Sequence, residues 1–313
     1  MAWRTVVISN PARLRIDNDR LVVVQEVETP LPLEDIAVLI LETPQVSLSS
    51  AVLARLSEYG ATVVACGPNH MPAFAGFPFA GHCRLVGVQR LQLQTSLPFR
   101  KRCWQGVVRA KISNQAECLR LADRDGAERL AAMCVEVTSG DTRNVESAAA
   151  REYFRLLFRP DFDRRVEHAV NSALNYGYAV IRAAVARSLA ASGFLLSQGI
   201  HHSSELNAFN LADDFLEPFR PVVDLCVASS PEFADLIRAS GEPKPDSQPQ
   251  LSKAHRERLA GLLAAQVRIE GERQALLRAT EITAASFGAA CRAGDPKRLR
   301  LPELLPLREH RYE

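Results

Sequence analysis

The amino-acid sequence predicts an α+β protein, with a small N-terminal domain built mostly from strands and a larger helical domain after it. The first ninety residues contain short runs rich in β-branched side chains, separated by turn-forming residues. From about Lys101 onward, apolar residues recur every three or four positions over long segments, which is the period of an α-helix. The pattern changes between residues 85 and 100, so we divide the chain into domains 1–90 and 91–294, followed by a tail at 295–313.

Five runs of the N-terminal domain are expected to form strands, because each is short, apolar and bounded by residues such as Asn10, Pro11 and Gly67. These runs are residues 5–8, 14–16, 21–24, 37–41 and 61–64. One helix is expected at 47–59, where the apolar spacing is helical and Gly60 can terminate the helix.

The second domain is expected to be all-helical. Its predicted helices cover residues 101–122, 126–138, 144–158, 165–193, 210–228 and 251–292. The last two are joined by a polar, proline-rich connector at 240–250, and the tail at 295–313 is basic and contains prolines. Both segments have the composition of poorly ordered chain.

The composition is that of a soluble cytoplasmic protein, with 47% hydrophobic residues and a net charge of +2. The longest apolar runs are far shorter than the roughly 20 residues that span a bilayer, and the N-terminus lacks the pattern of a signal peptide. We therefore expect no membrane association. Seven cysteines, an odd number without a Cys-x-x-Cys pair, argue against a disulfide framework and against a thiolate zinc site.

The charges are distributed unevenly along the chain. Residues 59–116 contain seven basic residues and no Asp or Glu. The seven are Arg84, Arg90, Arg100, Lys101, Arg102, Arg109 and Lys111. A region without carboxylates suits a polyanion such as DNA, because carboxylates repel phosphates while Lys and Arg release their counterions. Phe99 and Trp104 are candidates for stacking on bases, although ordinary core packing is the favoured explanation for either of them. The alternative for the basic residues is a solvated surface without a partner.

A carboxylate at the start of one predicted helix is the first candidate metal ligand. Glu146 shares a helix face with Ala150, Tyr153 and Leu157, so its side chain extends an otherwise apolar stripe. A carboxylate directed inward is costly unless a cation accompanies it. The alternative is that Glu146 only complements the dipole in the first helical turn.

Two further places offer ligands. His201 and His202 lie in a loop between helices, and at most one of these adjacent residues is expected to ligate. Asp214 and Glu217 are three residues apart, so their side chains are expected on one side of a helix, where they repel unless a cation lies between them. The alternatives are a hydrogen-bonded surface histidine and a solvated acidic face with Asp213 as a cap. Asn210 is expected to be the N-cap of this helix.

Taken together, one histidine and two or three carboxylates make an oxygen-rich set that suits Mg²⁺ or Mn²⁺. The common catalytic signatures are absent from the sequence, including phosphate-binding glycine loops and the His-Glu-x-x-His motif. An acidic metal site in a chain with a carboxylate-free basic region indicates phosphodiester chemistry.

Four segments, at residues 1–8, 146–154, 171–178 and 202–221, resemble the CRISPR-associated integrase and endonuclease of the spacer-acquisition machinery. The Trp3-Arg4-Thr5 start is similar to the type II branch of that family. The resemblance implies that Glu146, His202 and Glu217 bind the catalytic metal, with Asp214 as a neighbouring acid that contributes in some members.

The resemblance also implies an N-terminal β-sandwich-like domain that dimerises and a helical catalytic domain. It further implies a heterohexamer, in which a small ferredoxin-like CRISPR-associated protein bridges two such homodimers, and the type II effector nuclease is a further candidate partner.

The function expected from these features is metal-assisted transesterification of double-stranded DNA, in which an incoming spacer is joined to a CRISPR repeat. Water as the nucleophile gives endonuclease activity instead. The basic residues between 84 and 111, together with Arg220, are expected to bind phosphates rather than read bases. The alternatives are a stand-alone, structure-selective DNA nuclease and a non-catalytic DNA-binding scaffold.

Overall fold

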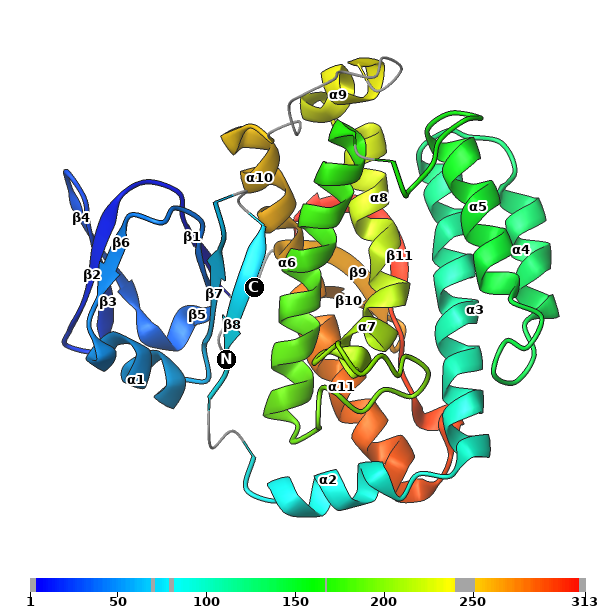
Figure 1. Ribbon diagram of the computed structural model, residues 1–313, viewed down its shortest axis with the longest axis horizontal. Helices are drawn as coiled ribbons and strands as arrows, with labels where there is room; N and C mark the ends of the chain where they lie inside the picture. The colour runs from blue at the N-terminus through cyan, green and yellow to red at the C-terminus, as the bar shows by residue number, and fades with distance from the viewer. Residues whose placement is uncertain (1–3, 69–70, 79–81, 167, 240–250, 310–313) are drawn as a thin grey trace. The chain divides into compact units, whose positions relative to one another are not determined.

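The computed structural model describes residues 4–68, 71–78, 82–166, 168–239 and 251–309. It divides into an N-terminal unit, Met1–Leu85, and a C-terminal unit, Val86–Glu313, which we describe separately. Strands dominate the first unit and helices the second, so the predicted α+β class is confirmed (Figure 1). The proline-rich connector at 240–250 lies outside the described residues.

The described part of the N-terminal unit contains two four-stranded sheets. The first has the order β1 (Arg4–Ile8), β5 (Ile36–Leu41), β7 (Thr62–Cys66) and β8 (Pro72–Gly76). Its first three strands are parallel and β8 is antiparallel. The second has the order β4 (Glu28–Pro32), β3 (Arg20–Val24), β2 (Ala12–Asp17) and β6 (Val46–Leu48). There β6 alone runs parallel to its neighbour.

One core joins these two sheets. Leu14 and Leu21 of the second sheet pack in the same cluster as Ile36 and Leu39 of the first, and α1 (Ser50–Glu58) adds Val52. Each predicted run is a strand, whereas β4, β6 and β8 were not predicted. The reason is local composition: β4 is an edge strand with two prolines, β6 has three residues, and β8 contains proline and glycine.

The C-terminal unit is built around two long helices, α3 (Leu97–Leu121) and α6 (Ala169–Ala191). The others are α2 (Leu85–Leu93), α4 (Ala127–Glu136), α5 (Val145–Leu157), α7 (Asn210–Leu216), α8 (Arg220–Ser229), α9 (Ala234–Ala239), α10 (Lys253–Ala260) and α11 (Leu276–Ala293). α6 packs against α7, α8, α10 and α11, while α3 packs against α4, α5 and α8 (Figure 1). Within the described residues, no helix combines the length and the apolar character needed to cross a bilayer.

The sequence predicted a single helix at 251–292. In the structure a β-hairpin interrupts this segment, so that prediction is wrong. β9 (Ala265–Ile269) pairs antiparallel with β10 (Glu272–Ala275) through the two-residue turn Glu270-Gly271. Both turn residues have positive φ, at 53° and 83°, which is the geometry of tight hairpins. Buried residues alternate along β9, so its apolar period is two rather than 3.6.

The prediction of a poorly ordered tail is wrong for residues 295–309. There β11 (Glu303–Glu309) adds a third strand to the hairpin by pairing antiparallel with β9. The buried Asn114 of α3 holds this strand: its amide donates to the Pro302 carbonyl at 2.9 Å, and its oxygen accepts from the Leu304 amide at 3.0 Å. The same amide donates to the Pro218 carbonyl at 2.8 Å, so the tail also supports the turn that carries Glu217.

Candidate metal centre

Glu146 is positioned by a cap at the start of α5. The carboxylate of Asp141 accepts hydrogen bonds from the backbone amides of Val145 and Glu146, at 3.0 and 2.9 Å. These bonds satisfy amides that a helix start leaves without partners. The half-buried Glu146 side chain then faces α3, where its Oε1 lies 2.7 Å from Nζ of Lys111.

Glu217 lies in the short 3-10 turn Glu217–Phe219 that joins α7 to α8. The residue is 5% exposed. Oε2 lies 2.5 Å from Lys111 Nζ, and Oε1 accepts a hydrogen bond from Arg220 Nε at 3.0 Å. Burial alone would raise the pKa of Glu217, but Arg220 and Lys111 outweigh burial and lower the pKa to about 2. Glu217 is therefore a carboxylate at neutral pH.

Lys111 was predicted to lie on the DNA-binding surface, but in the structure it lies in this site. The residue is 9% exposed and its ammonium lies between the carboxylates of Glu146 and Glu217. Burial lowers the pKa of Lys111, whereas the two glutamates raise it above its ordinary value and keep the ammonium charged. The spacing of apolar residues carried one sign that Lys111 is buried. Lys111 follows the buried Trp104 by seven residues and the buried Val107 by four, so all three lie on one face of the helix.

The carboxylate of Asp214, which the sequence suggested as a neighbouring metal ligand, is engaged by other partners in the structure. The side chain is fully buried and faces the loop before α7. Oδ2 accepts from the backbone amides of Ile200 and His201 at 2.6 and 3.2 Å, and Oδ1 accepts from that of His202 at 3.0 Å. A Cβ atom at Gly199 would lie 2.6 Å from Oδ2, so glycine is needed there. Asp214 therefore orients the loop that carries His202.

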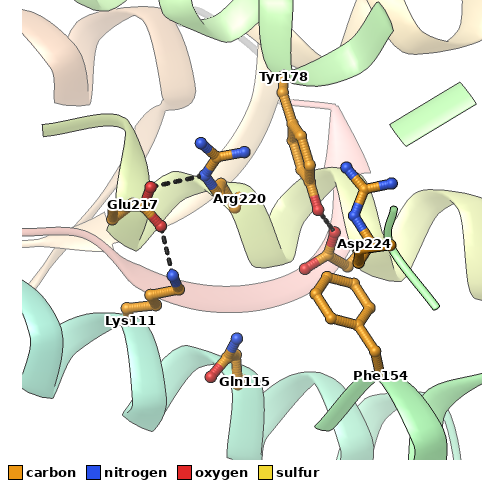
Figure 2. A pocket seen from close by; sticks show the side chains of 8 residues that line it. Lys111, Gln115, Phe154, Tyr178, Glu217, Arg220 and Asp224 are labelled. Carbon is orange, nitrogen blue, oxygen red and sulfur yellow. Dashed lines mark hydrogen bonds and ion pairs between the residues drawn. The ribbon is translucent and has the colours of Figure 1, made fainter. Parts of the chain in front are cut away.

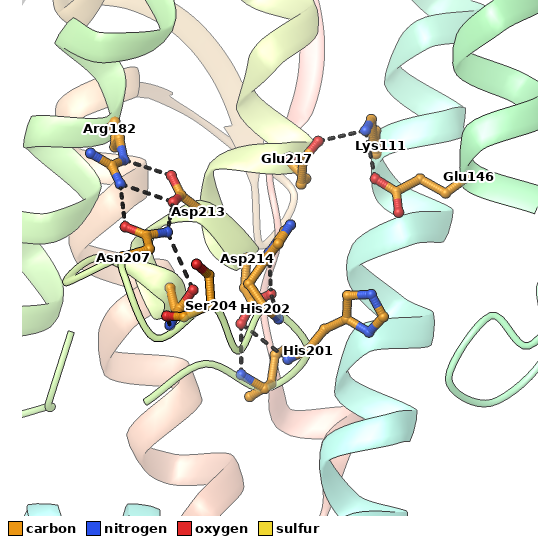
Figure 3. A network of polar contacts seen from close by, with 12 residues as sticks. Lys111, Glu146, Arg182, His201, His202, Ser204, Asn207, Asp213, Asp214 and Glu217 are labelled. Atoms are coloured by element: carbon orange, nitrogen blue, oxygen red, sulfur yellow. Dashed lines mark hydrogen bonds and ion pairs between the residues drawn. The ribbon is translucent and has the colours of Figure 1, made fainter. Parts of the chain in front are cut away.

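The same carboxylate fixes the imidazole of His202 (Figure 3). Oδ1 of Asp214 lies 2.8 Å from Nδ1 of His202. A carboxylate accepts a proton, so Nδ1 carries it and Nε2 keeps the lone pair that can bind a metal. The hydrogen bond to Asp214 raises the pKa of His202, and the negative charge of Glu217 raises it further. His202 therefore lies within the electrostatic reach of Glu217.

His201 occupies a different environment. Its exposed ring stacks on the buried indole of Trp104, with ring centroids 4.1 Å apart and planes at 2°. The ring of His202 meets the same indole edge-on, at 5.7 Å. Because Asp214 fixes its imidazole through Nδ1, we retain His202 as the candidate ligand.

The donor set fits Mg²⁺ or Mn²⁺ in its chemistry, with two carboxylates and one imidazole. In the described residues, no three His, Cys, Asp or Glu side chains stand close enough together to hold a metal ion. Glu146 and Glu217 instead share the ammonium of Lys111. The position between these two carboxylates is thus one at which the protein already holds a cation.

A second ion pair supports the loop from its other side. The guanidinium of Arg182 donates to both oxygens of Asp213, at 2.6 and 2.9 Å, and to the side-chain oxygen of Asn207 at 3.0 Å. Asn210 is the first residue of α7 rather than its cap, and its amide donates to the backbone carbonyls of Ser197 and Ser204. The loop from 197 to 207 is consequently held by side chains of α6 and α7.

A pocket of about 200 Å³ adjoins the carboxylates (Figure 2). It is lined by Lys111, Gln115, Phe154, Arg164, Tyr178, Glu217, Arg220 and Asp224. The guanidinium of Arg220 lies 4.5 Å from the ring centre of Tyr178. Of these residues, sequence reasoning proposed only Lys111, Glu217 and Arg220 for the site. The others come from four helices and from the turn before α6, and local spacing does not encode how these elements pack.

One of the residues that line this pocket, Asp224, has a buried carboxyl group. Both tyrosine hydroxyls near it, those of Tyr153 and Tyr178, donate to Asp224, the first at 3.0 Å. Burial raises the pKa of Asp224 to about 6, even though the two tyrosine hydrogen bonds favour the ionised form.

This pKa predicts a pH-dependent stability that Asp224→Asn removes. Between pH 4 and 6 the folded protein binds more protons than the unfolded chain, so the contribution of Asp224 to stability falls as the pH rises through this range. A difference of two pKa units corresponds to about 3 kcal/mol at most. Urea unfolding from pH 4 to 8 should show the wild-type protein losing stability relative to the variant. A difference that does not change with pH would contradict the assignment.

The predicted basic surface is divided between the two units. The exposed Arg84 belongs to the N-terminal unit. The remaining residues of this set, apart from Lys111, are exposed or half-buried on α2 and α3, and within the described residues none of them forms an ion pair with a carboxylate. They are Arg90, Arg100, Lys101, Arg102 and Arg109. Phe99 and Trp104 are buried, so neither is placed to stack on a base.

Comparisons with known proteins find sequence and structural relatives along the whole chain. The chain is 41% identical over 318 residues to the CRISPR-associated endonuclease Cas1 of Neisseria meningitidis serogroup C, and the match covers all of both chains. A casposase bound to its integration product superposes with a TM-score of 0.72 at 16% identity, covering 94% of this chain and 92% of the casposase. A Cas1 protein from Thermotoga maritima gives a TM-score of 0.70 at 15% identity, covering 93% and 98%.

A larger assembly also contains this fold. A chain of a Cas6-RT-Cas1–Cas2 complex superposes with a TM-score of 0.71 at 19% identity over 96% of this protein, which spans 36% of that longer chain. The sequence model of the family described as CRISPR associated protein Cas1 matches residues 5–263, which include every candidate ligand. The extent of this match and the meningococcal relative show that the chain belongs to the Cas1 family.

Proposed function

We propose that this chain is a metal-dependent DNA integrase with associated endonuclease activity, which inserts short DNA duplexes as new spacers at a CRISPR repeat. One observation carries the proposal: Glu146 and Glu217, from separate elements, face a single cation position. Asp214 in addition orients the imidazole of His202, the third candidate ligand. The endonuclease name of the meningococcal relative and the integration product bound to the casposase support it.

Glu146, Glu217 and Nε2 of His202 would hold Mg²⁺ or Mn²⁺. When bound, such an ion polarises the scissile phosphate and lowers the pKa of the attacking hydroxyl. In integration, the 3′-oxygen of the incoming duplex forms a new P–O bond, the existing P–O3′ bond of the repeat breaks, and a 3′-hydroxyl is released. With water as the nucleophile, the same substitution is hydrolysis.

The pocket next to the carboxylates suits the phosphates of the reacting strands. Arg220 presents its guanidinium there while its Nε holds Glu217. Arg164 donates to the amide oxygens of Asn171 and Asn175, and it forms no ion pair with a carboxylate of the described residues. A guanidinium held by neutral groups keeps its charge for a phosphate.

The basic cluster at the start of α3 should bind DNA without regard to sequence. Replacing Arg100, Lys101 and Arg102 by Ala is expected to weaken binding of unrelated duplexes to a similar extent. The slope of log affinity against log salt should become shallower by up to about 2.7, since each lost phosphate contact contributes about 0.9. Fluorescence anisotropy at several salt concentrations measures this slope.

A matched control removes three exposed charges that are already paired with surface carboxylates in the same unit. These are Arg129, Arg143 and Arg238. The control should leave the slope nearly unchanged. If the cluster variant has the wild-type slope, then Arg100, Lys101 and Arg102 do not contact DNA phosphates.

For the assembly, we infer a homodimer formed through the N-terminal unit and a heterohexamer with a small ferredoxin-like CRISPR-associated protein. The structural likeness to a chain of a Cas1–Cas2 complex supports such a partner. We also infer the type II branch, with its effector nuclease as a further partner, from the Trp3-Arg4-Thr5 start of the sequence.

A strand-transfer assay tests the function. Purified protein, with and without its small partner, is incubated with a short duplex, a CRISPR repeat and Mg²⁺ or Mn²⁺. Joined products that require the metal support the integrase. Cleaved products alone would favour a stand-alone nuclease, and no metal-dependent product would leave only a DNA-binding scaffold.

A further inference from the structure

We propose that Lys111 competes with the divalent metal for Glu146 and Glu217, so that this lysine sets the metal affinity of the site. The inference rests on the metal centre of the proposed function. Its basis is the position of one ammonium, Lys111 Nζ, which lies 2.7 Å from Oε1 of Glu146 and 2.5 Å from Oε2 of Glu217. Lys111 is 9% exposed, so water screens this arrangement only weakly.

The two cations exclude each other from this position. A metal ion bound by both carboxylates would lie about 2.0–2.2 Å from their oxygens. Since both oxygens are in direct contact with Lys111 Nζ, such an ion would occupy the space of the ammonium and repel its charge. Metal binding therefore requires the Lys111 side chain to move.

The surroundings allow this movement. Lys111 also lines the pocket of about 200 Å³ beside the carboxylates, which gives the displaced ammonium room on a flexible four-carbon stem. Arg220 does not compete in the same way, because its Nε contacts the other oxygen of Glu217, Oε1. Oε2 is buried and accepts no well-directed hydrogen bond within the described residues, so its contact with Lys111 is an ion pair.

Removing the lysine should therefore tighten metal binding and destabilise the metal-free protein. Lys111→Met keeps the apolar stem, removes the competing charge and leaves two carboxylates that lack one counterion. Metal binding no longer has to displace an ammonium or act against its field. At separations near 4 Å this repulsion is strong enough that we expect at least about a tenfold gain in affinity.

The test is a titration of the purified full chain with Mn²⁺, followed by electron paramagnetic resonance of the free ion. Lys111→Met should bind Mn²⁺ at least tenfold more tightly than wild type. The matched control, Lys253→Met, removes an exposed lysine from α10, outside the candidate site and the basic cluster, and should bind like wild type. Glu217→Gln should bind more weakly. If Lys111→Met binds Mn²⁺ no more tightly than wild type while Glu217→Gln binds it more weakly, the proposed competition by Lys111 is wrong and the metal centre itself is not contradicted.

The same titration separates this failure from failure of the proposed function. If wild type does not bind Mn²⁺, or if Glu217→Gln binds as wild type does, the metal centre itself is misplaced. Thermal unfolding provides a second readout. Mn²⁺ should raise the melting temperature of Lys111→Met more than that of wild type, since tighter binding to the folded state stabilises it more. Lys111→Gln serves if the Met variant does not fold, and an equal or smaller Mn²⁺ shift would contradict the proposal.

Discussion

Glu217→Gln should reduce metal-dependent strand transfer and cleavage at least about a thousandfold, because several kcal/mol of metal-derived stabilisation of the transition state would be lost. The amide preserves the shape of the side chain, so the turn between α7 and α8 should persist. It removes the negative charge, which a divalent ion needs and which Arg220 and Lys111 now compensate. Single-turnover assays at saturating DNA measure the loss.

A matched control for Glu217→Gln is Glu281→Gln on α11. Glu281 is also a partly buried acid held by two arginines, Arg187 and Arg278, but it lies outside the candidate site. This variant should keep nearly wild-type activity. DNA affinity of Glu217→Gln should stay within about threefold of wild type, because phosphate contacts dominate DNA binding. Retained strand transfer would remove Glu217 from the reaction.

Asp214→Ala should both destabilise the protein and weaken metal binding. The buried carboxylate accepts from three backbone amides and from the imidazole of His202, and alanine would leave these donors without it. Buried donors without acceptors cost about 1–3 kcal/mol each, so we expect a loss of roughly 3 kcal/mol after the loop relaxes. Loss of the partner that orients a ligand histidine costs about 10- to 100-fold in metal affinity.

Urea unfolding and Mn²⁺ titration measure the two effects of Asp214→Ala. Asp214→Asn retains one acceptor oxygen and should lie between the alanine variant and wild type in both measurements. Asp235→Ala removes an exposed acid from α9 and should change neither quantity. If Asp214→Ala binds Mn²⁺ as tightly as wild type, then the loop from 200 to 202 does not supply a ligand.

Much of the fold could be predicted from the sequence, because periodicity reports directly which face of an element is buried. The failures have local causes. The hairpin of β9 and β10 spans only eleven residues inside a longer helical pattern, from Ala265 to Ala275. The tail is ordered by hydrogen bonds from Asn114, which is 188 residues away from Pro302 in the sequence. Spacing along the chain carries no information about such distant partners.

The candidate site, like the fold, could be predicted only in part from the sequence. The inward direction expected for Glu146 corresponds to its contact with Lys111 of α3. The three-residue spacing of Asp214 and Glu217 indicated a shared metal. In the structure, backbone amides of the loop before α7 donate hydrogen bonds to both oxygens of Asp214. Lys111 was assigned to the DNA surface because a basic run reveals charge but not burial. The sequence thus singled out Glu146 and Glu217, which share one cation, but it did not reveal the burial of Lys111 or the hydrogen bonds of Asp214. The choice of Glu146, His202 and Glu217 as metal ligands stays a prediction.

The central claim is that Glu146, His202 and Glu217 together hold one divalent ion. Anomalous diffraction from crystals of the protein grown with Mn²⁺ tests it most directly. The account predicts one manganese peak about 2.0–2.6 Å from both carboxylates and from Nε2 of His202, with the Lys111 ammonium displaced into the neighbouring pocket. A manganese peak bound elsewhere, or Lys111 still joined to both glutamates in the presence of saturating Mn²⁺, would contradict it.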